Sequence, residues 1–273
     1  MDSRSPDTRT ALYCVLGKPI GHSLSPAMHN RAFANRNLNA VYLAFQVTDL
    51  EAAVDGIRAL GIKGASITLP HKTAVIPLLD KVDPAAAAIG AVNTIVNHDG
   101  TLVGKNSDSS GAIDALRKQT SIKGKSVLII GAGGAARAIG FGIHNQGGRI
   151  TVTNRSTQAG ESLAGDLGGS FVPAGELAAD GFDILINTTP AGMHPQTDAS
   201  PIPLGILRSE LTVMDIVYNP LKTRLLEAAA RKGCKTVDGL AMFVNQGARQ
   251  FEWWTGESAP VEIMRQAVLE SLP

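Results

Sequence analysis

Residues 125–155 constrain the fold of this chain more than any other stretch. Residues 126–130 (SVLII) form a continuous apolar run, which is typical of a strand covered on both faces of a parallel sheet. The sequence GAGGAA follows at residues 131–136, then a helical pattern to residue 145 and a predicted strand at residues 149–153. A glycine turn between a strand and a helix is the fingerprint of a dinucleotide-binding βαβ unit. The pattern therefore predicts a Rossmann-like unit.

Each small residue of this glycine loop has a physical role in the predicted unit. Gly131 permits the tight turn, Gly133 lets the backbone approach a pyrophosphate, and Ala136 lets the helix pack closely on the strand. The helix N-terminus offers N–H groups and partial positive charge to the phosphates. A glycine-rich turn without a ligand is the alternative. The candidate cofactor-binding residues of the loop are Gly131, Ala132, Gly133, Gly134 and Ala135.

The end of the second strand of this unit indicates which dinucleotide binds. NAD-binding proteins usually carry Asp or Glu there to hydrogen-bond the ribose 2′-hydroxyl, whereas this chain has Asn154, Arg155 and Ser156. A guanidinium can stack on adenine and pair with a 2′-phosphate. We therefore expect NADP(H), with Arg155 as the main discriminator. The alternative is that Arg155 is a solvated residue at a helix start.

Alternating strand and helix patterns run along the whole chain and predict an α/β fold. Predicted strands lie at residues 12–16, 40–47, 64–69, 94–97, 126–130, 149–153, 184–187, 212–216 and 234–237. Predicted helices lie at residues 26–35, 50–60, 73–79, 85–89, 134–145, 156–167, 222–232, 240–254 and 261–272. Ser25 is the expected N-cap of the first helix, with Pro26 at its first position.

These patterns predict two domains with a cleft between them. Residues 1–110 would form a substrate-binding and catalytic domain with a mainly parallel sheet, and residues 240–273 would complete it with C-terminal helices. Residues 111–239 would form the Rossmann domain that binds NADP. Ligands of open α/β sheets bind at the carboxyl ends of the strands. The site is therefore expected at those ends.

Composition excludes several classes of partner. Only 18% of the 273 residues are charged and the net charge is +1, so no basic patch for nucleic acid is expected. The chain has no uninterrupted apolar run long enough for a membrane span and no apolar signal core at its start. Its two cysteines, Cys14 and Cys234, suit reduced thiols in the cytoplasm. The six histidines lack metal-site spacing, so no metal is expected.

Polar residues in the first domain suggest a site for a small hydroxylated or anionic ligand. Ser23 and Ser25 stand two residues apart at a helix entrance, where capping and turn formation are the alternative roles. Thr68 and Lys72 follow a predicted strand within the sequence TLPHK. The segments GAVNT at residues 90–94 and GKNSDSSG at residues 104–111 come next.

Taken together and in order, these segments resemble the shikimate dehydrogenase family. The resemblance rests on the SxS loop, TxPxK, GAVNT, the NSD segment, GAGGA, the Asn-Arg pair and the C-terminal NQGARQFEWW sequence. It covers nearly the whole chain. It implies NADPH-dependent reduction of 3-dehydroshikimate to shikimate, and the reverse, within the shikimate pathway of aromatic amino-acid biosynthesis.

The resemblance also implies roles for individual residues. Ser23 and Ser25 would hydrogen-bond the substrate carboxylate, and Lys72 and Asp108 would form the catalytic pair. The residues that would contact the ring hydroxyls or hold the site are Thr68, Asn93 and Gln246, with Tyr218 nearby. The residues that would lie on the nicotinamide side are Thr188, Met193, Ile216, Gly239 and Met242. For Ile216 and Met242 a plain core role is an equal alternative.

The chemistry of ketone reduction suits the Lys72 and Asp108 pair independently. A hydride transfer leaves an alkoxide that needs a proton, and an ammonium can donate one while stabilising the negative charge. A neighbouring carboxylate orients the ammonium and favours its charged form, whereas burial opposes that form. Which of the two groups is the formal proton donor stays open, and a solvated surface lysine is the alternative.

Three departures from the family pattern leave specificity open. Residue 71 is His where an apolar or aromatic residue is common, and Ser107 replaces the more usual Thr. No second basic residue follows Arg155 within four positions, so some use of NAD(H) is expected. Alternative functions are a quinate/shikimate dehydrogenase that uses both cofactors and a non-catalytic dinucleotide sensor. Ser25 rather than Thr leans toward shikimate, and the chain is expected to be a monomer or homodimer.

Overall fold

A computed structural model describes residues 6–178 and 181–272 of the chain. The chain divides into two compact units, one made of residues 1–107 and 246–273 and the other of residues 108–245. The chain thus leaves the first unit once and returns to it near the C-terminus. The α/β fold class and the Rossmann-like unit predicted from the sequence are confirmed.

The first unit is built on a six-stranded sheet with the order β2-β1-β3-β5-β6-β4. Its strands are β1 (Ala11–Gly17), β2 (Ala40–Gln46), β3 (Gly64–Ile67), β4 (Lys81–Val82), β5 (Thr94–His98) and β6 (Thr101–Lys105). Strands β1, β2 and β3 are parallel, as the helical crossovers between them require. Strand β5 runs antiparallel to both β3 and β6, so the sheet is mixed.

The antiparallel part of this sheet comes from a two-residue turn that the sequence analysis did not interpret. Asp99 and Gly100 join β5 to β6 with φ angles of 49° and 98°. Two consecutive positive φ angles describe a type I′ turn, which favours Asp-Gly and produces a tight hairpin. Strand β5 was predicted, whereas β6 was not, because its sequence TLVGK is short and contains a glycine.

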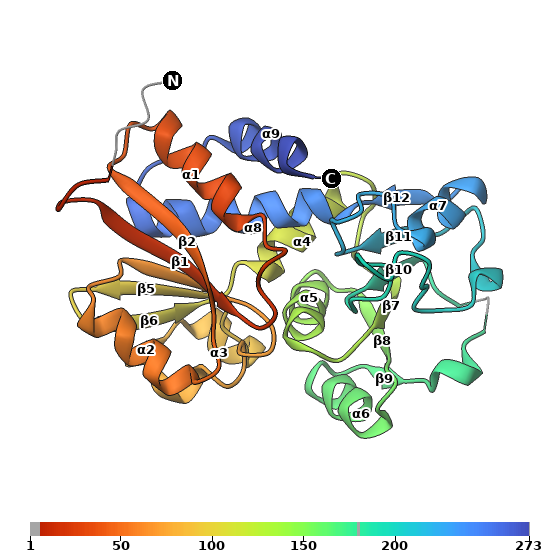
Figure 1. The fold of residues 1–273 in the computed structure, drawn as a ribbon. Coiled ribbons are helices and arrows are strands. Elements are labelled where there is room, and N and C mark those ends of the chain that lie inside the picture. The colour runs from red at the N-terminus through yellow and green to blue at the C-terminus, as the bar shows by residue number, and fades with distance from the viewer. Residues whose placement is uncertain (1–5, 179–180, 273) are drawn as a thin grey trace. The chain divides into compact units, whose positions relative to one another are not determined.

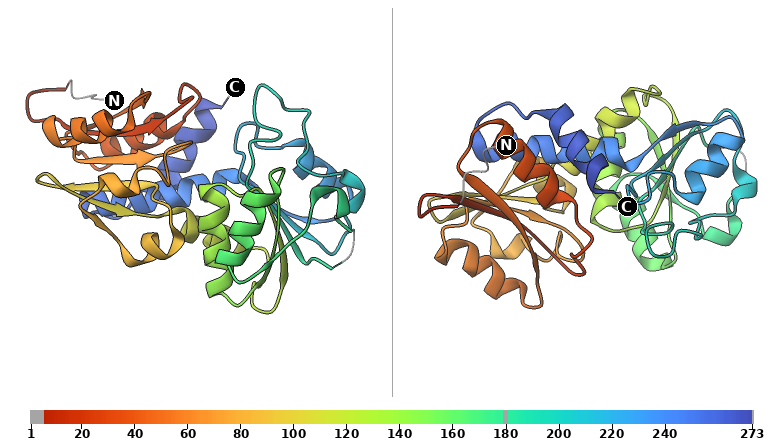
Figure 2. Two further views of the ribbon diagram at one scale, coloured as in Figure 1. Left: turned by 90° about the horizontal axis from the view of Figure 1, so that it is seen from below. Right: turned by 45° about the horizontal axis from the view of Figure 1, so that its top comes forward.

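Helices cover both faces of the first sheet (Figures 1 and 2). They are α1 (Ser25–Asn35), α2 (Leu50–Ala59), α3 (Pro84–Ile89), the part of α8 (Gly239–Thr255) from residue 246 onward, and α9 (Val261–Ser271), with a 3₁₀ turn η1 (Ile76–Leu78). One face packs Cys14 and Leu16 of β1 against Val54 and Ile57 of α2. The other face carries an aromatic cluster of Tyr13, His29, Phe33, Tyr42, Phe251 and Trp254.

The second unit has a six-stranded sheet in which every pair is parallel, with the order β12-β11-β10-β7-β8-β9. Its strands are β7 (Ser126–Ile130), β8 (Arg149–Thr153), β9 (Ser170–Phe171), β10 (Ile184–Asn187), β11 (Thr212–Asp215) and β12 (Lys235–Val237). Its helices are α4 (Asp108–Arg117), α5 (Gly134–Asn145), α6 (Thr157–Asp166) and α7 (Arg224–Arg231), with 3₁₀ turns η2 (Ala174–Glu176) and η3 (Leu204–Ile206).

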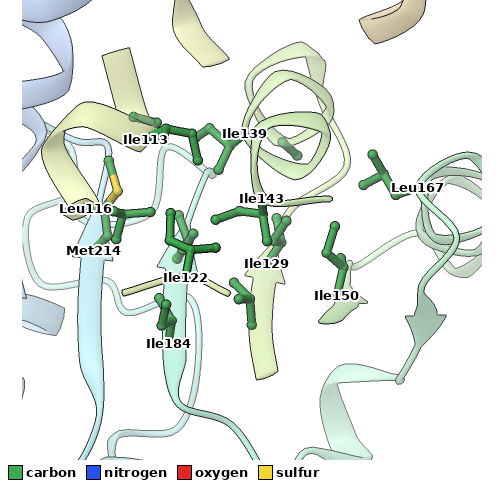
Figure 3. Packing of buried hydrophobic residues seen from close by; sticks show 14 of the residues in the cluster. Ile113, Leu116, Ile122, Ile129, Ile139, Ile143, Ile150, Leu167, Ile184 and Met214 are labelled. Carbon is green, nitrogen blue, oxygen red and sulfur yellow. The ribbon is translucent and has the colours of Figure 1, made fainter. Parts of the chain in front are cut away.

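The core of the second unit lies on both faces of its sheet because the strands are apolar throughout. On one face, Ile129 of β7 packs with Ile113 of α4 and with Ile139 and Ile143 of α5 (Figure 3). On the other face, Leu128 packs with residues of α7 and of the loop before β11. The continuous apolar run at residues 126–130 is thus explained by burial on both sides.

Side-chain caps mark the starts of several helices, and two predictions about helices need correction. Asp49, Ser156 and Thr223 cap α2, α6 and α7 by accepting backbone N–H groups through their side chains. Ser25 was expected to cap α1, but it is the first helical residue and Leu24 is the cap, without a side-chain bond. Helix α4 was missed because its first turn, DSSG, is rich in residues that disfavour helix interiors.

Candidate functional site

The polar residues singled out in the first unit lie at one edge of its sheet. Strands β1, β3 and β6 run in one direction, and β5 runs in the opposite direction. The carboxyl ends of β1, β3 and β6 therefore share an edge with the amino end of β5. The loop carrying Ser23 and Ser25 follows β1, Thr68 follows β3, Asn93 precedes β5, and Ser107 follows β6. Topology alone brings these four segments together.

Backbone hydrogen bonds hold the Thr68 and Lys72 segment at this edge. The Thr68 N–H donates to the Leu16 carbonyl oxygen at 3.0 Å, and the His71 N–H donates to the Thr68 carbonyl oxygen at 2.9 Å. The Lys72 carbonyl oxygen accepts from the Val92 N–H at 2.8 Å. Both Thr68 and Lys72 are half-buried. The lysine is thus anchored by its backbone to the segment that carries Asn93.

The serine loop is also ordered by its own hydrogen bonds. The Ser23 hydroxyl accepts from the Ser25 N–H at 3.3 Å, which forms the turn into α1. Ser25 is buried, with 6% of its surface exposed, whereas Ser23 is half-buried. The turn-forming role considered for these serines is therefore real for Ser23. It leaves the hydroxyl hydrogen of Ser23 outside that bond, since the oxygen is the acceptor.

Asn93 is the centre of a buried polar cluster. Its Oδ1 accepts from the Ser107 N–H at 2.9 Å and from Thr94 Oγ1 at 2.7 Å, and its Nδ2 donates to Ser107 Oγ at 3.0 Å. Ser107 Oγ also lies 3.5 Å from Gln246 Oε1. The first unit thus brings together Asn93 and Gln246, two residues predicted to serve the same ligand.

A second set of buried polar residues adjoins Asn93 and was missed by the sequence analysis. It comprises Tyr42, Ser66, Thr94 and Gln250, all buried and joined by side-chain hydrogen bonds. Gln250 stands four residues after Gln246, so both lie on one face of α8. That i, i+4 spacing in NQGARQ is the signal that could have indicated a shared role.

The glycine loop of the second unit has the geometry that a dinucleotide pyrophosphate requires. Gly131 adopts φ of +111°, and a Cβ there would lie 2.5 Å from Thr188 Oγ1, so only glycine fits. Gly133 is the N-cap of α5, has no side-chain cap bond, and faces open space where a Cβ would be. The loop therefore fits a phosphate group approaching the N-terminus of α5.

The residues after β8 combine an exposed arginine with two side chains that are bonded locally. Arg155 is exposed, and within residues 6–178 and 181–272 no carboxylate pairs with it. The Asn154 Nδ2 donates to the Ser156 carbonyl oxygen at 2.9 Å. The Ser156 Oγ accepts from the Ala159 N–H at 3.5 Å as the cap of α6. Arg155 is thus available to a ligand, whereas the oxygen of Ser156 already serves its own helix.

Two loops at the carboxyl ends of β10 and β11 are joined by a buried carboxylate, Asp215. Its oxygens accept from Asn187 Nδ2 at 2.9 Å, the Val217 N–H at 3.0 Å and Thr223 Oγ1 at 2.7 Å. Burial raises the pKa of Asp215 to about 6, although these hydrogen bonds oppose the rise. Asp215 therefore ties the loop that follows β10 to the loop that follows β11.

The residues predicted on the nicotinamide side occupy these loops and the start of α8. The Thr188 Oγ1 donates to the Ile130 carbonyl oxygen at 2.7 Å, beside the glycine loop. A Cβ on Gly239 would lie 2.5 Å from the carbonyl oxygens of Ile216 and Val217, so glycine is needed for this close approach. Met242 is 6% exposed and belongs to the hydrophobic core of this unit.

Three further residues predicted to belong to the site are Tyr218, Met193 and Asp108. Tyr218 stacks on Phe243, with ring centroids 4.2 Å apart. The Met193 N–H donates to the Pro190 carbonyl oxygen in the loop after β10. Asp108 is the first residue of α4 and so lies in the second unit, whereas Lys72 lies in the first.

The described part of the chain contains no group of three or more side chains that could ligate a metal ion. No helix there combines the length and apolar character that a membrane crossing demands.

Models of three protein domains match this chain over separate segments. The shikimate dehydrogenase substrate binding domain matches residues 15–95, the shikimate/quinate 5-dehydrogenase domain matches residues 114–216, and the shikimate 5′-dehydrogenase C-terminal domain matches residues 239–269. The three segments follow one another along the chain. They include the serine loop, the glycine loop and α8.

Relatives and solved structures agree with these matches. The chain is 46% identical to shikimate dehydrogenase (NADP(+)) of Moorella thermoacetica over 96% of its own length and 94% of that protein. A shikimate dehydrogenase crystallised with NADP+ has a TM-score of 0.94 and 39% identity, with 98% of each chain covered. The Listeria monocytogenes shikimate 5-dehydrogenase in complex with shikimate and NAD has a TM-score of 0.86 and 38% identity, covering 96% of this chain and 97% of its own.

Proposed function

The chain belongs to the shikimate dehydrogenase family, and from this premise we propose how its residues interconvert shikimate and 3-dehydroshikimate. It is an NADP-dependent oxidoreductase that acts on a CH–OH group of a small-molecule substrate, in the shikimate pathway of aromatic amino-acid biosynthesis. The observation that carries the proposal is the polar edge of the first sheet, where four loops supply hydroxyl, amide and ammonium groups.

The substrate-binding residues are proposed from this edge. Ser23 and Ser25 donate hydroxyl hydrogen bonds to the substrate carboxylate. The residues that contact or hold the ring hydroxyls are Thr68, Asn93, Gln246 and Tyr218. The support for Asn93 and Gln246 is that Ser107 hydrogen-bonds both of them in the structure.

Lys72 and Asp108 form the proposed catalytic pair. In the reducing direction, a proton must reach the alkoxide oxygen that develops on the substrate as the hydride arrives at its carbon. The Lys72 ammonium stabilises that negative charge, and the pair supplies the proton. Asp108 is proposed to orient the ammonium. In the oxidising direction the pair accepts the hydroxyl proton instead.

NADP(H) supplies or accepts the hydride, and the second unit is proposed to hold it. The glycine loop at residues 131–135 contacts the pyrophosphate through the backbone N–H groups at the start of α5. Arg155, with Asn154 and Ser156 beside it, contacts the 2′-phosphate and adenine. The residues proposed to line the nicotinamide side are Thr188, Met193, Ile216, Gly239 and Met242. Because only one arginine serves the 2′-phosphate, NAD(H) is used as well, more weakly.

One assay tests this function directly. Purified protein would be incubated with shikimate or quinate and with NADP or NAD, while absorbance of the reduced nicotinamide is followed. Shikimate with NADP should give the highest kcat/KM of the four pairs. A preference for quinate would favour a quinate/shikimate dehydrogenase. Absence of turnover with all four pairs would overturn the proposed enzymatic function and favour a dinucleotide sensor.

We also propose that the protein works in the cytoplasm, as a monomer or a homodimer. Support for this location comes from the two buried free cysteines, Cys14 and Cys234, which form no disulfide. Cell fractionation and light scattering would check the two statements separately. A membrane-associated or secreted protein, or a larger assembly, would contradict them.

A further inference from the structure

Gln250 is a buried glutamine that the proposed chemistry does not use. Only 1% of its surface is exposed. Its Oε1 accepts from Ser66 Oγ at 2.8 Å, and its Nε2 donates to the Asn93 carbonyl oxygen at 3.1 Å and to Thr94 Oγ1 at 2.9 Å. Both N–H groups and the oxygen of the amide are therefore engaged. Reversing the amide would put its oxygen against the Asn93 carbonyl oxygen, which can only accept.

On one side, this amide fixes the orientation of Asn93. Thr94 Oγ1 accepts from Gln250, so its single hydroxyl proton is directed to Asn93 Oδ1, at 2.7 Å. The Ser107 N–H donates to the same oxygen at 2.9 Å. The oxygen of the Asn93 amide therefore faces the protein, and its nitrogen donates to Ser107 Oγ at 3.0 Å. Without the Thr94 proton, one of the bonds that select this orientation would be lost.

On the other side, the same amide orders the hydroxyls of Ser66 and Tyr42. Ser66 gives its proton to Gln250 Oε1, so it accepts from the Tyr42 hydroxyl at 2.6 Å. The pKa of Tyr42 is raised well above its usual value by burial, and hydrogen bonds with Ser66 and Ser25 oppose this rise. The Tyr42 proton is thus directed to Ser66 and the Ser66 proton to Gln250, so the amide of Gln250 gives each of these two hydroxyls one orientation.

We propose that Gln250 is a positioning residue, which sets the orientation of Asn93 toward the substrate. This inference rests on the substrate-binding role proposed above for Asn93. A buried network that is fully satisfied rigidifies its members, so this contact would be oriented before the substrate binds. The competing role is purely structural, namely that Gln250 only ties α8 to the sheet.

A pair of neighbouring variants separates positioning from structure. Gln250→Met keeps an unbranched side chain of similar length but removes every hydrogen bond. Phe251→Leu is the matched control, because Phe251 is fully buried in the same helix and packs on Phe33 without joining the polar chain. Both variants should melt at lower temperature than the wild type. Only Gln250→Met should raise the KM for shikimate, by about 10-fold, the equivalent of one to two hydrogen bonds.

The KM for NADP should stay within twofold of the wild type in both variants. A double-mutant cycle with Asn93→Ala then tests whether Gln250 acts through Asn93. The loss of kcat/KM in the double variant should be clearly smaller than the product of the two single losses. Losses that multiply, or an unchanged shikimate KM in Gln250→Met, would overturn the proposal.

Gln250→Glu adds a pH signature, measured in a His29→Phe background. The titratable groups that face this position are His29 of α1, which interacts with Gln250, and Tyr42 of β2, which is linked to it through Ser66. A protonated carboxyl retains one donor and one acceptor, whereas an ionised one draws the Thr94 proton away from Asn93. The shikimate KM of Gln250→Glu should therefore rise with pH relative to that of Gln250→Met. A constant ratio between the two variants across the pH range would contradict the proposed route through Thr94.

The orientation of Asn93 can also be observed without turnover. Side-chain amide signals of Asn93 in NMR spectra, assigned by their loss in Asn93→Asp, should shift in Gln250→Met and not in Phe251→Leu. Unchanged signals would overturn the positioning role. A wild-type protein that fails to oxidise shikimate would instead overturn the proposed function, and the NMR result would still decide the role of Gln250.

Discussion

Lys72 and Lys63 stand on either side of β3, which makes a comparison between two lysines possible. Lys72 follows the strand at the polar edge, whereas Lys63 precedes it at the opposite end and is exposed. Lys72→Ala should lower kcat by more than about 100-fold, the usual contribution of a positioned proton donor or acceptor. Lys63→Ala should have little effect, and both should bind NADPH as the wild type does. Steady-state kinetics would measure kcat, and fluorescence titration would measure NADPH affinity. A near-normal kcat in Lys72→Ala would exclude Lys72 from the catalytic pair.

Arg155 has a similar matched control at the other end of β8. Arg155→Ala should raise the KM for NADP about 10- to 100-fold, as expected for loss of a charge-assisted hydrogen bond to phosphate, and should change the KM for NAD much less. Arg149, at the start of the same strand, donates to Ser126 Oγ at 2.8 Å. Arg149→Ala should leave both values near those of the wild type. Equal losses for the two cofactors in Arg155→Ala would contradict a contact with the 2′-phosphate.

Thr153, the last residue of β8, carries an unused hydroxyl. It is 1% exposed, and its Oγ1 has no hydrogen-bond partner among the described residues. A buried polar atom without a partner costs roughly 1–3 kcal/mol. Thr153→Val should therefore increase the free energy of unfolding by about 1 kcal/mol, the lower end of that range. Urea unfolding followed by circular dichroism would measure it, and a destabilised variant would mean that the hydroxyl has a partner in solution.

At the scale of elements, the loops after β10 and β11 depend on Asp215. Asp215→Ala would leave three donors unpaired, so it should destabilise the second unit by about 3 kcal/mol. It should also weaken NADPH binding about 10-fold, because both loops are proposed to contact the nicotinamide. Asp215→Asn should be close to the wild type, since its oxygen can serve Asn187 and Val217 while the Thr223 hydroxyl reverses. Fluorescence titration with NADPH would compare them. If Asp215→Ala bound NADPH with the affinity of the wild type, Asp215 would not be needed to order the two loops.

The elements of the second unit were largely predictable because their signals are local. An apolar strand, a glycine turn and a helix follow one another within residues 126–145, and each depends on its neighbours in sequence. The hairpin of β5 and β6 is also encoded locally, because the Asp99-Gly100 dipeptide favours a tight turn, but the hairpin was not predicted from it. Helix α4 was hidden by its poor first turn, DSSG.

The buried network could not be predicted in the same way. The hydrogen bond between Ser66 and Gln250 joins residues 184 positions apart, and nothing near either residue in sequence indicates the other. The candidate residues Asn93 and Gln246 were proposed from a resemblance, but the side chains that orient Asn93 became visible only from the fold. Long-range polar contacts depend on sheet topology, which short patterns do not determine.

For the whole molecule, the two units should respond to acid in opposite directions. Burial lowers the pKa of His29 in the first unit to about 3, so between about pH 6.5 and 3 the unfolded chain binds a proton there that the native chain does not. Stability of the first unit therefore falls as pH falls through this window. Burial raises the pKa of Asp215 to about 6, so its contribution to the second unit is largest at low pH and is lost as pH rises from about 3.8 through 6.

Tryptophan fluorescence can separate the two responses, because Trp253 and Trp254 both belong to the first unit. His29→Phe keeps an aromatic ring beside Tyr42 and removes the titration. Its free energy of unfolding relative to the wild type should rise by up to about 1.4 kcal/mol for each pH unit below 6.5. The exposed His98 offers the control, since His98→Gln should follow the wild type. Parallel curves for His29→Phe and the wild type would contradict the assigned pKa.

The return of the chain to its first unit has a consequence for synthesis. A ribosome that has made residues 1–245 has completed the second unit, yet the first unit still lacks the last turns of α8 and all of α9. Until those residues emerge, the aromatic face of the first sheet has no Phe251 or Trp254 to cover it. Vectorial folding would therefore form the unit proposed to bind the dinucleotide before the unit proposed to bind the substrate. A chain cut short after residue 245 would be a cofactor-binding module without a finished substrate pocket.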